Sequence, residues 1–362
     1  MSVQETNLKA IADAIKAKTG ETGTIKASEF ASKISTIETG IDTSDATATA
    51  SDVVSGMTGY ANNQKITGTL IPIEKPKWTQ TTMPDETGWR SVCYGNGKFV
   101  AVVYSSNIAA YSTDGITWTQ TELPATKYWS SVCYGNGKFV VVARNDNIAA
   151  YSADGITWTQ VTLPVSKSWQ SVCYGNGKFV VVADNNNDIA IYSTDGITWA
   201  QTTMPSKEYW ESVCYGNGKF MAVAQAINIA VYSADGITWT QTTLPASVSW
   251  YLVCYGNGKF VAVAYNSNIA AYSTDGINWT QTMMPSRAKW YSVCYGNGKF
   301  VAVADDSNIA VYSADGINWT RSTLPASGNR YSVCYGNGKF VAVANNNNST
   351  AAYLKDSFDE WA

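Results

Sequence analysis

The octapeptide Val-Cys-Tyr-Gly-Asn-Gly-Lys-Phe occurs seven times in this 362-residue chain, with successive copies 40 or 41 residues apart. A fixed period of about 40 residues with strand-like content is typical of a β-propeller, in which each repeat is one four-stranded blade. The sequence therefore predicts a mainly β protein whose residues 75–362 form a seven-bladed propeller. The copies begin at Val92, Val132, Val172, Val213, Val253, Val293 and Val333.

The repeat that begins at Trp129 is expected to form four strands. An Asn-Gly pair, which favours a tight hairpin, follows the first strand, and an Asp-Gly turn precedes the fourth. The second strand, KFVVVA, is apolar without alternation, as expected where neighbouring blades cover both faces of a sheet. The expected strands are residues 131–134, 138–143, 148–152 and 156–162, and Pro164 is expected to end the last of them.

The distribution of fourth strands predicts how the ring closes. Only six complete fourth strands follow the seven copies of the first three, and the missing one stands upstream as Trp78–Pro84. This segment matches Trp239–Pro245 at almost every residue. We therefore expect an N-terminal outer strand to complete the last blade, which removes exposed sheet edges. The C-terminal segment 356–361 (DSFDEW) is an alternative source of that strand.

Two segments differ between copies, whereas the hairpin and the Asp-Gly turn barely change. One joins the second strand to the third, and the other joins the fourth strand to the next blade. Because connections alternate between the two ends of an up-and-down sheet, both variable segments should share one face of the propeller. Their Tyr, Ser, Asn, Asp and Arg content is typical of adaptable binding loops. The candidate ligand-binding residues in these segments are Tyr104, Tyr128, Arg144, Asp146, Asp184, Tyr209, Tyr265 and Asp305.

Each first strand opens with Trp, or with Arg in the last copy, followed by a residue that varies. The Trp rings are candidates for stacking on a ligand ring, and packing between blades is the alternative that their near-invariance also suits. The residue after each Trp is expected to contact the ligand. The opening residues are Trp89, Trp129, Trp169, Trp210, Trp250, Trp290 and Arg330, and the candidates that follow them are Arg90, Gln170, Glu211, Tyr251, Tyr291 and Tyr331.

Composition argues against several classes of site. The net charge of −3 offers no basic surface to nucleic acid, and no apolar run is long enough for membrane insertion. The chain has no histidine, and its seven cysteines occupy one equivalent position each, so we expect neither a zinc site nor a disulfide framework. We expect no metal, no cofactor and no catalytic residue. Paired carboxylates such as Asp305 and Asp306 keep a glycan-cleaving enzyme as an alternative.

The first 74 residues are expected to form a small attachment module. The pattern NLKAIADAIKAK predicts an amphipathic helix over residues 7–18, and Ser28 is expected to cap a second short helix. We expect a helical attachment segment over residues 1–39, then a linker and small β module over 40–74 with a strand at 64–71. The apolar face of the first helix carries Leu8, Ile11, Ala12 and Ile15.

The segments NLKAIADAIKAKTGETGTIKASEFASKI and DATATASDVVSGMTGYANNQKITGTLIP resemble N-terminal segments of tail-fibre and receptor-binding proteins from bacteriophages and prophages of Gram-positive bacteria. The YGNGKFVAV and YSTDGITWT repeats resemble propeller repeats attached to such segments, and the Asp-Gly turn resembles the Asp-box of sialidase-type propellers, one residue shorter. No arginine lies in a motif matching the arginine cluster of those enzymes.

The resemblance implies an adhesin at the virion tail, assembled in the bacterial cytoplasm and often a homotrimer. Its N-terminal segment would dock to tail or baseplate proteins, and its propeller would bind a host cell-surface polysaccharide. A structural tail component that binds a protein partner is the other alternative.

Overall fold

The computed structural model describes residues 3–20, 22–30, 33, 49, 58–61, 64–67, 77–84, 88–305, 307–345 and 350–355. The chain divides into two compact units, Met1–Lys75 and Pro76–Ala362. Most of the expected linker lies outside the described residues, as do Asp306 and the C-terminal segment 356–361. No helix in the described part of the chain is long and apolar enough to cross a membrane.

The first unit contains α1 (Val3–Thr19), the short 3-10 helix η1 (Ala27–Glu29) and a hairpin of β1 (Thr58–Ala61) with β2 (Gln64–Thr67). Of the expected apolar face of α1, Ala12 and Ile15 are buried against Ile25, whereas Leu8 and Ile11 are exposed. The helix ends where Gly20, at a φ of 73°, donates its N–H to the Lys16 carbonyl at 2.8 Å.

The expected cap at Ser28 is wrong, because Ser28 lies inside η1. Lys26 holds the N-cap position instead, and its backbone N–H donates to the Glu29 carboxylate at 3.0 Å. The reach of the Glu29 side chain back to this N–H satisfies a donor that the helix itself leaves open.

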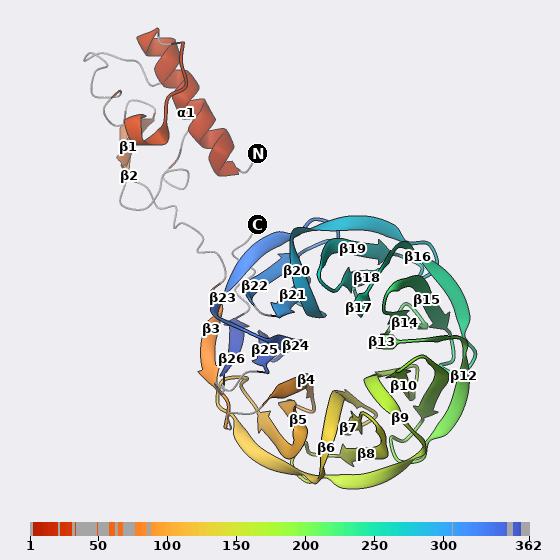
Figure 1. The fold of residues 1–362 in the computed structure, drawn as a ribbon. Helices are drawn as coiled ribbons and strands as arrows, with labels where there is room; N and C mark the ends of the chain where they lie inside the picture. The colour runs from red at the N-terminus through yellow and green to blue at the C-terminus, as the bar shows by residue number, and fades with distance from the viewer. Residues whose placement is uncertain are drawn as a thin grey trace. The chain divides into compact units, whose positions relative to one another are not determined.

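The second unit is a β-propeller, in which antiparallel sheets surround a central axis (Figure 1). Its first strands are β3 (Thr79–Thr82), β4 (Trp89–Gly95), β5 (Lys98–Ser112), β6 (Thr119–Gly135), β7 (Lys138–Ala143), β8 (Asp146–Ser152), β9 (Thr159–Gly175), β10 (Lys178–Asp184), β11 (Asn187–Ser193) and β12 (Ala200–Glu208). They are followed by β13 (Trp210–Gly216), β14 (Lys219–Ala224), β15 (Ile227–Ser233), β16 (Thr240–Val248), β17 (Trp250–Gly256), β18 (Lys259–Ala264), β19 (Ser267–Ser273), β20 (Thr280–Gly296), β21 (Lys299–Asp305), β22 (Ser307–Ser313), β23 (Thr320–Gly328), β24 (Arg330–Gly336), β25 (Lys339–Ala344) and β26 (Thr350–Lys355).

Each octapeptide forms the predicted hairpin at the inner end of a sheet. In the first copy Gly95 pairs with Lys98, and the two turn residues Asn96 and Gly97 have φ values of 45° and 72°. Two consecutive positive φ angles define the tight turn that matches the twist of the flanking strands, which is why Asn-Gly recurs here. The inner strands are β4, β13, β17, β24 and the C-terminal parts of β6, β9 and β20 (Figure 1).

The expected end of the fourth strand at Pro164 is wrong. The strand β9 continues from Thr159 through Pro164 into the inner strand of the next repeat. Its pairing with β8 moves from Ile148 opposite Thr162 to Asp146 opposite Lys167, so Pro164 lies in a bulge without a ladder partner. A proline costs no hydrogen bond there, because no partner strand needs its N–H.

The core lies between neighbouring sheets and is built from the second strands. The strand β7 is buried at every residue from Phe139 to Ala143, as expected when sheets cover both of its faces. A typical cluster joins Val140 and Val142 of one repeat to Trp169 and Phe179 of the next. Six such clusters recur with equivalent residues in the described part of the second unit.

Side chains join each inner strand to its neighbour. The Ser91 hydroxyl accepts the Val132 N–H at 3.1 Å, and the Ser332 hydroxyl accepts the Val92 N–H at 3.2 Å, so β24 lies beside β4. Between β17 and β20 the equivalent residue is Leu252, which has no hydroxyl to offer. The equivalent bonds elsewhere run from Val172 to Ser131, Val213 to Ser171, Val253 to Ser212 and Val333 to Ser292.

The sheet that contains β24 has the strand order β24-β25-β26-β3. The strand β3 pairs antiparallel with β26, with Thr82 opposite Thr350. Just before β3, Trp78 is 2% exposed and packs in a cluster with Leu324 and Phe340. The strand β3 is thus the outermost strand of this sheet.

The prediction that constant and variable turns lie on opposite faces is confirmed. On one face, the Asn96 side-chain amide donates to the Ala153 carbonyl in the next Asp-Gly turn at 3.3 Å. On the opposite face, the two kinds of variable segment contact each other. For example, the Arg144 backbone N–H donates to the Tyr128 carbonyl at 2.9 Å. The aspartates of the Asp-Gly turns have the predicted structural role, since Asp154 accepts the N–H groups of the two residues after Gly155 at 2.8 Å each.

Candidate functional site

A β-bulge in each inner strand turns one variable side chain toward the central axis. In β4, Trp89 pairs with Val103 and Ser91 pairs with the adjacent Val102, so Arg90 has no residue opposite it. A bulge of this kind re-aims a side chain and is common beside functional sites. Arg90 and its six equivalents line one cavity at the axis. The equivalents are Ser130, Gln170, Glu211, Tyr251, Tyr291 and Tyr331.

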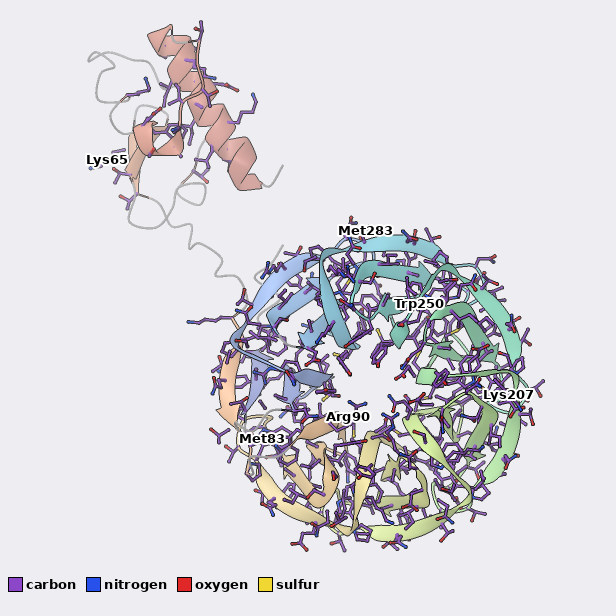
Figure 2. All side chains as sticks on the ribbon, in the orientation of Figure 1. Lys65, Met83, Arg90, Lys207, Trp250 and Met283 are labelled. Atoms are coloured by element: carbon purple, nitrogen blue, oxygen red, sulfur yellow. The ribbon has the colours of Figure 1, made fainter. Side chains whose placement is uncertain are left out.

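This cavity opens on the variable face as the channel-mouth pocket, whose volume is about 340 Å³. Six of its residues are bulge residues, and the others come from the turns between second and third strands. Figure 2 labels Arg90 among the side chains at the inner ends of the sheets. The channel-mouth pocket is lined by Arg90, Tyr104, Arg144, Gln170, Asp184, Glu211, Gln225, Tyr251, Tyr291, Tyr331 and Asn345.

Glu211 is the most deeply buried carboxylate of the pocket, at 5% exposed. Its two oxygens accept hydrogen bonds from the side-chain amides of Gln170, at 2.6 Å, and Gln225. Burial raises the pKa of Glu211 to about 7, and the charge of Asp184 raises it further, whereas the amides and Arg144 oppose the rise. Both protonation states of this carboxyl group are therefore populated near neutral pH.

Arg144 and Asp184 form an ion pair beside Glu211. The Arg144 guanidinium contacts the Asp184 carboxylate and also donates from Nε to the Ser168 hydroxyl at 3.1 Å. The two charges cancel at this wall of the pocket, and the guanidinium is held in place by neighbours on both sides.

A tyrosine arc formed by Tyr251, Tyr265, Tyr291 and Tyr331 begins beside Glu211, because the Gln225 amide also donates to the Tyr251 hydroxyl at 3.4 Å. The rings of Tyr251 and Tyr265 are stacked with centroids 4.6 Å apart, and the rings of Tyr291 and Tyr331 lie 4.3 Å apart. Burial raises the pKa of Tyr251 to about 12 and also raises the pKa values of Tyr291 and Tyr331. The arc therefore presents aromatic faces and neutral hydroxyl groups at physiological pH.

Arg90 places a positive charge at the end of the tyrosine arc. Its guanidinium carbon lies 4.8 Å from the ring centroid of Tyr331, with the rings of Tyr104 and Tyr291 within 6 Å. The ion pairs found among the described residues do not include Arg90. Its charge is therefore balanced by ring faces and leaves room for an anion.

A second cavity, the outer groove, lies beside the arc on the same face. Its volume is about 540 Å³. Arg287 is exposed there and donates from Nε to the Asn266 carbonyl at 2.9 Å. The outer groove is lined by Val248, Ser249, Tyr265, Asn266, Ser267, Asn268 and Arg287.

The expectation that the Trp rings stack on a ligand is corrected by their burial. All six are fully buried, so no ligand on the face can reach them. They pack between sheets, and the indole N–H of Trp250 donates to the Ala246 carbonyl at 3.0 Å. The affected candidates are Trp89, Trp129, Trp169, Trp210, Trp250 and Trp290.

Arg330, the residue in place of the seventh Trp, is likewise fully buried, which corrects its assignment to the ligand. Its Nη1 donates to the Thr350 carbonyl at 3.3 Å, whereas Nε and Nη2 have no hydrogen-bond partner among the described residues. Burial lowers the pKa of this guanidinium to about 10.

The remaining candidates lie on the variable face without lining the two cavities. Tyr128 and Tyr209 are exposed at 46% and 45%. Asp146 forms an ion pair with Lys127 at 2.6 Å, and Asp305 is 8% exposed and lies opposite Lys289 in the ladder. Tyr128 and Tyr209 are therefore available only to a ligand that extends beyond the channel mouth, whereas Asp305 is buried.

Gln225, Asn345 and Ser130 lie at positions that the sequence pattern marked, but they were not among the named candidates. The first two lie in variable turns, so the pattern of variation marked their segments but not their side chains. Ser130 is short, and its hydroxyl donates to the Trp169 carbonyl at 2.6 Å, which leaves space in that wall.

The seven cysteines contribute no reactive group. All are free, and burial raises the pKa of every thiol. A thiol held neutral is a poor nucleophile and a poor metal ligand. Cys254 is buried, and the other six are half-buried.

Comparison with known proteins shows the fold. Residues 164–287 match the family described as the DUF6242 beta propeller domain. No curated protein matches the chain. Virginiamycin B lyase from Staphylococcus aureus is 12% identical, with a TM-score of 0.70 over 78% of this chain and 99% of that one. YCF48 bound to D1 peptide is 14% identical, with a TM-score of 0.64 over 78% of this chain and 96% of that one.

A third structure, the WD40 propeller domain of Doa1, is 14% identical, with a TM-score of 0.61 over 80% of this chain and 100% of that one. At these identities the likeness extends to the propeller architecture and not to the residues of the site.

Proposed function

We propose that this protein is a receptor-binding adhesin of a phage tail, whose propeller binds a host cell-surface glycan at the channel-mouth pocket. One observation carries the proposal: the bulge residues that differ between nearly identical repeats converge on one cavity. Tyrosine faces pack against sugar rings, while Arg, Gln and carboxylate groups hydrogen-bond hydroxyls. A constant scaffold with one diversified pocket suits recognition of a variable surface.

The proposed propeller has seven blades, one for each octapeptide, and β3 is the outer strand of the blade that contains β24. The pairing of β3 with β26 and the hydrogen bond from Val92 to Ser332 support this arrangement. A closed ring leaves only the short inner and outer edges of each sheet, which suits a protein exposed outside the cell.

The first unit is proposed to attach the propeller to tail or baseplate proteins, as its resemblance to phage tail segments implies. Several copies on one virion, for which a homotrimer is the simplest assembly, would convert weak single sites into strong adsorption. The exposed Leu8 and Ile11 on α1 are apolar residues that such an attachment would cover.

Adsorption of the purified full-length chain to Gram-positive cells and to their isolated cell-wall polysaccharide tests this function. The test variant carries Tyr251→Ser, Tyr291→Ser and Tyr331→Ser, because Ser130 shows that the bulge accepts serine. We expect at least a tenfold loss of affinity, about 1.4 kcal/mol. The control is Ile197→Ser, which alters an exposed residue in an Asp-Gly turn on the constant face. Equal adsorption by both variants would favour a structural tail component instead.

A glycan-cleaving enzyme is the second candidate, because Glu211 combines deep burial with a pKa of about 7. A carboxyl group in that state can protonate a glycosidic oxygen, although the nearby Asp184 is held by Arg144. Reducing ends released from host polysaccharide by the wild-type chain, and lost in Glu211→Gln, would favour the enzyme. Retention of polysaccharide without cleavage supports the adhesin.

A further inference from the structure

We propose that the outer groove is a second subsite for the same ligand, and that this ligand is a linear anionic polymer of sugars or polyols. The inference rests on the proposed function and adds to it the chemical class and length of the ligand. It follows from the continuity of the two cavities, the placement of their charges and the distance between them.

The channel-mouth pocket and the outer groove share a wall. Tyr265 lines the outer groove, and its ring stacks on Tyr251, which lines the channel-mouth pocket. The same ring lies 5.5 Å from Tyr291 at nearly a right angle. A chain that leaves the channel mouth over Tyr251 therefore meets an aromatic surface that continues into the outer groove.

Positive charge stands at both ends of this path. Arg90 lies at the inner end beside Tyr331, and Arg287 lies at the outer end. Neither forms one of the ion pairs found among the described residues. Arg287 is anchored through Nε to the Asn266 carbonyl, so its terminal nitrogens project from a fixed point and can contact an oxyanion.

The carboxylates near this path are held by neighbouring groups or lie opposite a lysine. Asp184 is paired with Arg144. Glu211 lies beside Tyr251, with its two oxygens occupied by the side-chain amides of Gln170 and Gln225, and the Gln225 amide also donates to the Tyr251 hydroxyl at 3.4 Å. Asp305, whose charge acts on Tyr331, lies opposite Lys289 in the ladder. Arg90 and Arg287 at the two ends of the path therefore favour anionic groups on the ligand, most strongly away from Glu211.

The length of the path requires more than one sugar unit. Tyr251 belongs to the inner strand β17, and Arg287 lies on β20, the outer strand of the same sheet, next to β19. Three strand spacings of about 4.8 Å separate them, roughly 14 Å in total. A single sugar ring that packs on Tyr251 therefore cannot also contact Arg287, so affinity should rise with chain length until the ligand reaches Arg287.

Calorimetric titration of the full-length chain with oligomers of defined length tests the inference. The probes are hyaluronan oligosaccharides, which carry carboxylates, glycerol phosphate oligomers, which carry phosphates, and neutral dextran oligosaccharides. Arg287→Gln removes the outer cation, and Arg287→Lys restores the charge. Arg321→Gln is the matched control, because Arg321 is exposed and lies near the start of β23 by the constant face.

For one of the anionic probes, we expect Arg287→Gln to lower the affinity of long oligomers about tenfold and to leave the shortest oligomers unaffected. Arg287→Lys should recover most of the loss, and Arg321→Gln should match the wild type. The probe that shows this pattern identifies the anion as carboxylate or phosphate.

Wild-type binding that is equal for short and long oligomers, or a preference for dextran, would overturn this inference alone. Absence of wild-type binding to all three probes, together with unchanged cell adsorption in the tyrosine variant, would overturn the proposed function as well.

Discussion

Replacing Arg330 by tryptophan should stabilise the propeller. Arg330 takes the position that Trp occupies in the other six repeats, and it pairs with Ala344 as Trp290 pairs with Ala304. Its side chain is fully buried, and two of its three nitrogens have no hydrogen-bond partner among the described residues. The fold therefore holds a poorly solvated cation where its own repeats show that an indole fits.

Two estimates of the cost of Arg330 agree. Each unsatisfied buried donor costs about 1–3 kcal/mol, so the two nitrogens together cost about 2–6 kcal/mol. The lowering of the Arg330 pKa from 12.5 to about 10 by burial corresponds to about 3 kcal/mol against the charged form. The incoming indole N–H should add little cost, because Trp169 and Trp210 are buried with the same group unpaired among the described residues.

We therefore expect Arg330→Trp to raise the free energy of unfolding by about 3 kcal/mol, and the melting temperature by roughly 6 °C. Differential scanning calorimetry and denaturant unfolding measure both quantities. The reciprocal change Trp290→Arg should lower stability by at least as much, and polysaccharide binding should be the same in the Arg330 variant and the wild type. A melting temperature at or below the wild-type value would refute the reasoning, because the buried guanidinium would then be well accommodated.

Three further changes test other parts of the fold. Leu252→Ser should supply the missing acceptor for the Val293 N–H but also remove the packing of Leu252 on its hydrophobic cluster, so in denaturant unfolding it should be more stable than Leu252→Ala by about 1 kcal/mol; equal stability of these two variants would contradict the role given to these serines. Folding raises the pKa of Glu211 from 4.5 to about 7, so the stability that its protonated form contributes is present below pH 4.5 and is lost as the pH rises through 7. We therefore expect the free energy of unfolding of Glu211→Gln to exceed that of the wild type by up to about 3 kcal/mol at pH 8 and to be similar to it at pH 4. Gly135→Ala should destabilise by about 1–3 kcal/mol, since its Cβ would lie 2.0 Å from the Tyr174 ring, and an unchanged melting temperature would show that the ring can move.

The repeat period and the turn residues were sufficient to predict the propeller architecture and the separation of its two faces. Asn96 and Gly97 specify the inner hairpin through their backbone angles, and Asp154 specifies its own turn through local hydrogen bonds. Such features are encoded within a few residues, so they can be read without tertiary structure. Variation also marked the residue after each Trp as a candidate for ligand contact, and the structure brings these residues together around one cavity.

The parts that sequence reasoning missed depend on register between strands. Trp89 and Arg90 are neighbours in the chain, yet the bulge buries the first side chain and directs the second into the cavity. Pro164 stays within β9 for a related reason, since a bulge removes it from the ladder. Nothing in a period of 40 residues shows where pairing slips by one position.

The pairing of β3 with β26 has a consequence for how the protein is made. Thr82 leaves the ribosome long before its partner Thr350, and at about 5–20 residues per second the interval is on the order of 15–50 s. During that time the nascent chain can stack its repeats one by one, but Trp78 and β3 have no site to occupy. The docking of β3 onto β26 therefore waits until β26 has been synthesised, and chains released before that point would lack this pairing.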